Sequence, residues 1–503
     1  MVIEAADAAA HAVDPRRWWI LAVLNLSLVM IVVANTSLNL ALPGLSEHLH
    51  ASGSELQWVV DAYALVFAGL LLTAGALGDR YGRKGTLQLG LLIFGGASVV
   101  AALSHSMAVL ISARAVMGVG AALVMPATLS VLAHVFPPEE RGRAIAIWAA
   151  FAGAGGAAGY LVGGWLLHHF WWGSIFLLNV VVAATALVAG RVLVPPTREA
   201  YPSRLDPVGA LLSTVGVAGL LLAVIQAPDH GWLSVSTLLV GGASAAVLAG
   251  WLKWEQSRRD PMLDVRWFRS PRFSASATTI TLLFFATYGM LFVLTQYFQL
   301  VRGYSTLDAG LRILPNPIAY LLIAPRSARL VDRLGPRRVI VGGLLTMALS
   351  LVGLALLTPS TPYAYVAGSL VLLAIGTSMV TPPSTTGIIV SMPLEKAGVG
   401  SAINDTTREL GGALGVAVIG SVVAARFHAG MPARAPRTLA DAVAVPALLT
   451  QARDAYTSAM GTAMAISAAA LLVAAGVVAW ALRPVAAAAP ATAAEGSDLA
   501  EAR

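Results

Sequence analysis

The stretch that decides the fold is residues 55–84, which read ELQWVVDAYALVFAGLLLTAGALGDRYGRK. Residues 55–77 form an apolar run long enough to cross a bilayer, since a membrane-spanning helix needs about 20 such residues. The run ends in a short turn, residues 78–84, that contains two glycines and three basic residues. Because basic residues gather in cytoplasmic loops, this turn predicts that the chain reverses at a membrane surface.

The same kind of apolar run recurs along the chain. The 503 residues are 57% hydrophobic and 11% charged, whereas a soluble domain carries about 25% charged residues. We therefore expect an all-α membrane protein with fourteen transmembrane helices. The expected helices lie at about 18–42, 55–77, 86–104, 107–135, 143–167, 173–195, 206–226, 233–254, 273–300, 306–330, 338–357, 362–391, 398–424 and 456–482.

The distribution of basic residues predicts the orientation. If the N-terminus lies in the cytoplasm, 23 of the 32 Lys and Arg residues fall on the cytoplasmic side and five on the outer side. This asymmetry follows the positive-inside rule. We expect a cytoplasmic segment over residues 1–17 and a disordered cytoplasmic tail over residues 483–503. Both termini are then cytoplasmic.

Several function classes are excluded by what the sequence contains. The net charge of +7 comes from loop residues between apolar runs, so we expect no nucleic-acid partner. The sequence has no Cys and no Gly-x-x-x-x-Gly-Lys-(Ser/Thr) phosphate loop, and its histidines lack further ligands. We expect no enzyme, no cofactor and no metal site.

The turn at 78–84 has a counterpart at residues 331–338, which read VDRLGPRR. Each turn follows a spanning run and has the pattern Asp-Arg-x-Gly-x-basic. This repeat predicts two matching six-helix halves, residues 18–195 and 273–482. Residues 196–272 then form an inserted two-helix hairpin with its linkers. Parallel halves of this kind are typical of major facilitator transporters.

The 78–84 turn itself resembles the signature loop of the major facilitator superfamily. The residues that match are Gly78, Asp79, Arg80, Gly82 and Arg83. The glycines permit a tight turn, Asp79 can cap a helix or pair with Arg, and the basic residues anchor at the interface. The resemblance implies a gating loop, and the alternative is an ordinary positively charged loop.

A glycine pattern in the run 143–167 resembles the superfamily's antiporter signature. It consists of Gly155, Gly159, Gly163 and Gly164, with Tyr160 where the family usually has Pro. Glycines one turn apart allow another helix to approach closely. The departure at Tyr160 weakens the expectation of a kink and of antiport, and helix packing alone explains the glycines equally well.

The start of the run 398–424 resembles the fourteen-helix drug:proton antiporters of the EmrB/QacA type. The polar residues there are Asn404, Asp405, Arg408 and Glu409. The segments at 35–43 and 57–65 match the same family, and the resemblance covers about residues 16–485. It implies the major facilitator fold. We expect these four residues to form a network at the cytoplasmic gate, and a purely structural network is the alternative.

Proton coupling needs a titratable group in the membrane. Many relatives in this family carry an acid in the first helix, where this chain has Ala34. Asp61 is the clearest remaining acid, and a buried carboxylate has its pKa raised toward neutrality. An intramembrane charge needs a partner, so we expect Asp61 to pair with Arg114. The alternative is that Asp61 is hydrated near the outer end of its helix.

The expected substrate cavity has polar and aromatic candidates. They are Asn35, Gln57, Tyr288, Phe292 and Gln296. Aromatic walls suit apolar and cationic ligands, although aromatic residues that face lipid are also common.

These features together predict a monomeric transporter in a bacterial plasma membrane that exports amphipathic or cationic small molecules in exchange for protons. One alternative is an exporter of an endogenous metabolite or lipid with weak or no proton coupling, which Ala34 and Tyr160 favour. A proton symporter working as an importer and a non-transporting membrane sensor are the other two alternatives.

Overall fold

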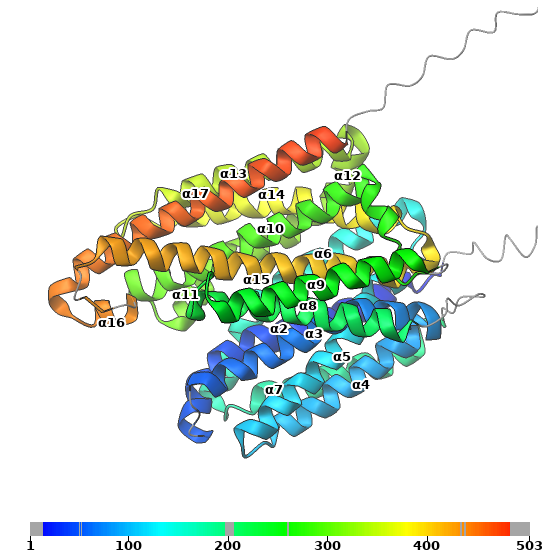
Figure 1. Cartoon of the computed structure of the whole chain (residues 1–503), viewed down its shortest axis with the longest axis horizontal. Helices are drawn as coiled ribbons and strands as arrows, with labels where there is room; N and C mark the ends of the chain where they lie inside the picture. Colours follow the sequence, from blue (N-terminus) through cyan, green and yellow to red (C-terminus); the bar gives the residue numbers. More distant parts are fainter. Residues whose placement is uncertain are drawn as a thin grey trace, which may run out of the picture.

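The computed structural model describes residues 14–49, 51, 53–196, 206–258, 261–432, 435–436 and 439–482. The regular elements of this part of the chain are helices (Figure 1). They are α2 (Arg17–Leu49), α3 (Gly53–Tyr81), α4 (Arg83–Ala102), α5 (Met107–Val135), α6 (Pro138–His169), α7 (Ser174–Leu193), α8 (Pro207–His230), α9 (Val235–Ser257), α10 (Pro271–Gln296), α11 (Thr306–Ile313), α12 (Pro315–Leu334), α13 (Pro336–Ala355), α14 (Tyr363–Val390), α15 (Ala397–Gly430), α16 (Leu439–Val443) and α17 (Leu449–Ala481). Single turns lie at Val265–Arg269, Leu394–Lys396 and Pro446–Leu448, and a π-helical turn at Tyr297–Val301 continues α10. The predicted all-α architecture is confirmed.

Within the described residues, thirteen helices are long and apolar enough to cross a membrane. The run expected at 306–330 is the exception, and the prediction of one unbroken helix there was wrong. The chain forms the short α11 and then α12, with the break at Leu314. Pro315 begins α12, and three arginines and an aspartate in its second half keep it below the hydropathy of a spanning helix. A proline at the first helical position lacks the N–H that would continue the preceding helix.

The helices pack around two buried hydrophobic clusters. The first is built mainly from α2 to α7, and the second mainly from α10, α13, α14, α15 and α17. We call α2–α7 the N-terminal group and α10–α17 the C-terminal group. Figure 1 shows most helices of the two groups on opposite sides of the bundle, and α8 and α9 overlie the middle of this view. The predictions for the ends of the chain, at 1–13 and 483–503, lie outside the described residues.

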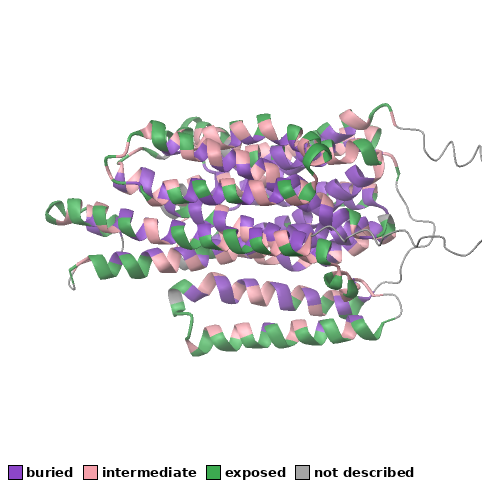
Figure 2. Cartoon of the chain, turned by 90° about the horizontal axis from the view of Figure 1, so that it is seen from above, coloured by how far each residue is buried: buried purple, intermediate pink, exposed green. Residues whose placement is uncertain are grey.

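Helices α8 and α9 form a hairpin on the outside of the bundle. Helix α8 packs on α3, where a Cβ at Gly69 would lie 3.1 Å from the Ala218 Cβ. Thr73 Oγ1 on α3 lies 3.4 Å from the Ala210 carbonyl oxygen and 3.3 Å from Thr214 Oγ1. Helix α9 contacts mainly α8 and is exposed over most of its length, as the helix pair at the edge of Figure 2 shows.

The two predicted turns have the same backbone geometry. Gly82 separates α3 from α4 with a φ of 102°, and Gly335 separates α12 from α13 with a φ of 79°. Only glycine adopts this conformation without steric cost. The internal repeat seen in the sequence therefore corresponds to the same sharp turn at equivalent places in the two groups.

Candidate functional site

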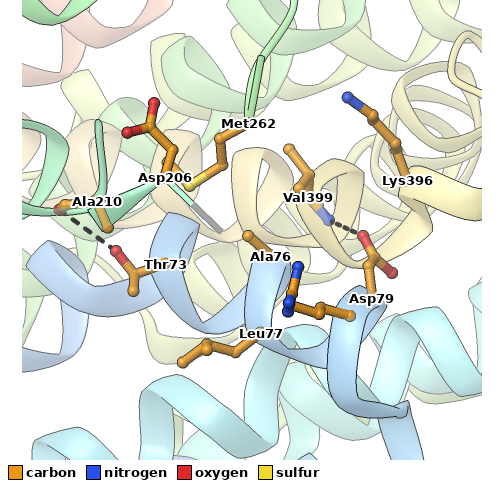
Figure 3. Close-up of a pocket in the computed structure, with 10 residues that line it drawn as sticks. Thr73, Ala76, Leu77, Asp79, Asp206, Ala210, Met262, Lys396 and Val399 are labelled. Atoms are coloured by element: carbon orange, nitrogen blue, oxygen red, sulfur yellow. Dashed lines mark hydrogen bonds between the residues drawn. The ribbon is translucent and has the colours of Figure 1, made fainter. Parts of the chain in front are cut away.

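The end of the bundle that carries the 78–84 turn, here called the basic end, is closed by contacts between α3 and α15. The buried carboxylate of Asp79 accepts hydrogen bonds from the backbone N–H groups of Gly398 at 2.9 Å and Val399 at 3.1 Å. It also accepts one from Arg83 Nη2 at 3.1 Å. These N–H groups belong to the first turn of α15, where a negative charge is favoured by the helix dipole. Figure 3 shows Asp79 on α3 directed at Val399.

The backbones of α3 and α15 approach closely just above this contact. A Cβ at Gly75 would lie 2.5 Å from the Gly398 carbonyl oxygen. A cavity of about 40 Å³ remains beside the closure, and Figure 3 shows its walls. They come from α3, including Arg80, from the start of α8, from Met262 and from the start of α15. Gly78 faces Thr86, whose side chain would lie 3.8 Å from an added Cβ.

Arg114 lies deep in the N-terminal group, with 1% of its surface exposed. Its guanidinium donates from Nε to the Val59 carbonyl oxygen at 3.0 Å and from Nη2 to Asn35 Oδ1 at 3.2 Å. It also stacks on the Tyr63 ring at 4.3 Å. Asp61 is on the same helix as Val59 and is partly buried. Among the described residues, Arg114 binds Val59 and Asn35 and not Asp61. The expected Asp61–Arg114 pair is therefore not formed in this state.

The glycine motif of α6 faces α2. A Cβ at Gly155 would lie 3.2 Å from the Val32 Cβ, and one at Gly159 would lie 1.8 Å from Thr36 Oγ1. One at Gly163 would lie 2.7 Å from the Ser37 Cβ. The contacts at Gly159 and Gly163 are closer than real Cβ atoms show, and the contact at Gly155 is tighter than most, so these three glycines of the motif set the α2–α6 distance.

The remaining two members of that region face another way. Gly164 and Tyr160 line a cavity of about 240 Å³ together with Leu40 of α2 and Leu307 of α11. Helix α6 runs without interruption from Pro138 to His169. The helical hydrogen bonding is thus continuous through Tyr160, which stands where the family usually has Pro.

The polar residues of α15 form a buried network. Asn404 donates from Nδ2 to Asp405 Oδ1 at 3.2 Å and accepts from Thr385 Oγ1 at 3.0 Å. Arg408 Nη1 lies 3.8 Å from Asp405 Oδ1. Glu409 is partly buried on the next turn of α15. The residues lie seven to twelve positions into α15, about 10–20 Å from its start at 1.5 Å per residue, and so toward the middle of the bundle.

The five cavity candidates lie on α2, α3 and α10. Asn35 is bound to Arg114, and Gln57 is exposed. Tyr288 and Phe292 on α10 lie against glycines of α15, since a Cβ at Gly412 would lie 2.4 Å from Tyr288 and one at Gly420 would lie 3.1 Å from Phe292. Gln296 is partly buried at the end of α10.

Sequence reasoning missed two aromatic residues of this region. The Arg114 guanidinium lies over the Tyr63 ring. The centre of the Trp148 ring on α6 lies 5.7 Å from Cζ of Arg408. Tyr63 could have been singled out in the sequence because it lies two residues after Asp61 in the same apolar run. For Trp148 the signal was an indole N–H within an apolar helix, which needs an acceptor and finds it in Thr128 Oγ1 at 3.1 Å.

Comparison with known proteins identifies the fold and the family. The sequence pattern of the Major Facilitator Superfamily matches residues 24–416. The chain belongs to this superfamily. Its members are transporters and not enzymes. Among solved structures of this fold, the human organic anion transporter MFSD10 has a TM-score of 0.65 at 15% identity, covering 92% of this chain and 100% of its own. The proton:xylose symporter XylE has a TM-score of 0.60 at 16% identity, covering 92% and 95%.

The curated relatives narrow the family further. The multidrug efflux pump LfrA of Mycolicibacterium smegmatis is 34% identical over 93% of this chain and 97% of its own. The tetracenomycin C resistance and export protein of Streptomyces glaucescens is 32% identical over 93% and 92%. The methyl viologen resistance protein SmvA of Salmonella typhimurium is 34% identical over 83% and 84%. The predicted kinship with fourteen-helix drug efflux transporters is confirmed, and the chain is a multi-pass membrane protein with bacterial homologues.

Proposed function

We propose that this superfamily member exports amphipathic or cationic small molecules across a bacterial plasma membrane in exchange for protons. The observation that carries the proposal is a set of buried charges on both sides of the interface between the two helix groups. Arg114 lies in the N-terminal group, and Asp405 and Arg408 lie in the C-terminal group. Ionisable groups within spanning helices are costly and mark transport pathways. The relatives named for efflux and for drug resistance support the substrate class.

Asp61 is the proposed carrier of the coupling proton. In the state described here Arg114 is engaged by Asn35 and Val59. Protonation of Asp61 from the outer side and its pairing with Arg114 are assigned to other states of the cycle. Asp405 and Glu409 are further acids that lie within the bundle. Both termini are assigned to the cytoplasm, and the protein acts as a monomer.

Ethidium uptake into everted membrane vesicles tests the proposal. With the chain present, an imposed proton gradient drives ethidium into the vesicles, and a protonophore abolishes the uptake. Asp61→Asn removes the titratable group with little change in shape and abolishes the gradient dependence. The matched control is Asp454→Asn, which changes an exposed carboxylate at the start of α17 and leaves transport intact.

Two results would contradict parts of this proposal. Normal gradient-driven transport in Asp61→Asn would remove the proton role from Asp61. Export that ignores the gradient would favour the second candidate, an exporter of an endogenous metabolite or lipid without strict coupling. The observation that favours this candidate is the buried Ala34 of α2, which stands where many relatives carry an acid.

A further inference from the structure

The guanidinium of Arg408 lies on two aromatic rings that come from different helix groups. Its Cζ is 4.7 Å from the centre of the Phe284 ring on α10 and 5.7 Å from the centre of the Trp148 ring on α6. Trp148 is 1% exposed and is held by its hydrogen bond to Thr128. Phe284 packs against both hydrophobic clusters. The two rings therefore form an aromatic site across the interface.

A carboxylate completes this site and is only partly satisfied. Asp405 is 1% exposed, and its Oδ1 lies 3.8 Å from Arg408 Nη1. This is longer than the 2.7–2.9 Å or so of a charge-assisted hydrogen bond. Among the described residues, Asp405 Oδ2 and Arg408 Nε are buried atoms that have no hydrogen-bond partner. A buried ion pair of this looseness is poorly compensated for its loss of water.

Two aromatic faces beside a buried carboxylate are the chemistry that recognises an organic cation. Trp and Phe faces attract a cation through their quadrupoles, with Trp the stronger. A carboxylate that keeps a free oxygen adds charge complementarity. In this structure the cation that occupies the site belongs to the protein itself.

We infer that the Trp148–Phe284–Asp405 site binds the cationic group of the substrate, and that Arg408 is a tethered cation that competes for it. A planar or quaternary organic cation enters when the Arg408 side chain leaves the rings. Because one ring belongs to each helix group, the bound cation contacts both groups at once. This inference rests on the proposed export of cationic molecules and identifies the site that selects them.

Arg408→Gln tests the competition directly. Binding of tetraphenylphosphonium to the purified full chain in lipid nanodiscs is measured by isothermal titration calorimetry. Removing the tethered cation empties the rings, so the affinity rises by about 2- to 30-fold, the range that a single cation–π contact spans. Binding of the uncharged dye Nile red, followed by its fluorescence, stays unchanged.

The matched control is Arg312→Gln. Arg312 also lies over an aromatic ring, with its Cζ 3.9 Å from the Tyr304 ring centre, and beside an aspartate, with Nη1 3.2 Å from Asp308 Oδ1. It has the same chemistry at the end of the bundle opposite the basic end. Tetraphenylphosphonium affinity does not change in this variant. A second variant, Phe284→Leu on the Arg408→Gln background, lowers the affinity again because it removes one ring.

The outcomes separate this inference from the proposed function. A folded Arg408→Gln protein that binds tetraphenylphosphonium no more tightly than the parent overturns the competition. If that variant does not fold, Arg408→Lys is used instead. Its compact, strongly hydrated ammonium competes less well than a guanidinium, so the affinity for tetraphenylphosphonium is expected to rise by a smaller factor. Equal or weaker binding of tetraphenylphosphonium overturns the inference. If the parent protein exports ethidium but Arg408→Gln does not bind tetraphenylphosphonium more tightly, only the inference is contradicted. A parent protein that neither binds nor exports a cation overturns the proposed function and the inference together.

Discussion

A single added methyl group at Gly75 is expected to open the basic end. A Cβ at this position would lie 2.5 Å from the Gly398 carbonyl oxygen and 2.9 Å from the Ala402 Cβ. Neither atom belongs to a flexible side chain, so neither can turn away. The contact is relieved only if α3 and α15 separate. In the separated state the methyl group meets no such obstacle.

The size of the effect follows from this geometry. Overpacking a tight contact by one methyl group costs about 1–3 kcal/mol. The gain in helix propensity from Gly to Ala is common to the closed and open states and cancels. Since 1.4 kcal/mol is a factor of ten, the ratio of closed to open molecules falls roughly 5- to 150-fold.

The absence of cysteine in this sequence makes the assay clean. Spin labels are attached to two introduced cysteines, Tyr81→Cys at the end of α3 and Glu395→Cys just before α15, both exposed positions. Pulsed electron paramagnetic resonance then measures the distance between the two helix ends. Gly75→Ala is expected to add or enlarge a population with a longer distance.

The control is Gly85→Ala in α4, where an added Cβ meets nothing within 4 Å. Its distance distribution is expected to match that of the parent. Identical distributions for Gly75→Ala and the parent would show that the contact between α3 and α15 does not hold the basic end closed.

Three further predictions concern other close contacts. Asp79→Asn, which removes the charge that two backbone N–H groups of α15 bind, is expected to weaken the closed state by about 1.5–3 kcal/mol and to lengthen the same label distance, whereas the exposed Asp332→Asn in the second turn is expected to change nothing. Gly159→Ala, whose methyl group would lie 1.8 Å from an α2 side chain, is expected to lower the free energy of unfolding by about 1–3 kcal/mol in thermal melts, whereas Gly156→Ala, with nothing within 4 Å, is expected to leave it unchanged. Lys396→Met removes the 2.7 Å hydrogen bond to the Pro261 carbonyl, and the amides that follow that carbonyl are expected to exchange hydrogen faster by mass spectrometry; unchanged exchange would show that this bond does not order the segment.

The helices were predictable because lipid leaves few alternatives. Each long apolar run must satisfy its backbone within itself, so it becomes a helix. The break between α11 and α12 was missed because a run of apolar residues can contain prolines and still be counted as one helix. The backbone at Leu314 and Pro315 does not continue one helix. The paired turns were predictable because Gly82 and Gly335 both need a positive φ.

The partners of the buried charges were less predictable. We expected Arg114 to find a carboxylate, because opposite charges are visible in a sequence. It finds the carbonyl oxygen of Val59 and the amide of Asn35. Asp79 likewise binds backbone N–H groups at the start of α15. Every residue carries backbone donors and acceptors, so only the packing of helices shows which of them lies beside a charge.

The α8–α9 hairpin restricts the way in which the basic end can open. Helix α8 packs against both α3 and α15, so separating these two helices must break one of its contact surfaces. Its surface on α3 includes the close approach at Gly69 and the contacts of Thr73. On the α15 side, the hydrogen bond from Trp232 to Ser421 lies just past the end of α8, far from the basic end. The contact with α3 is thus fixed near the opening, and the bond to α15 lies near the opposite end of the bundle. Helix α8 is therefore expected to stay with α3 when Gly75→Ala separates α3 from α15. The segment at Pro261, which Lys396 binds directly before the start of α15, must then release.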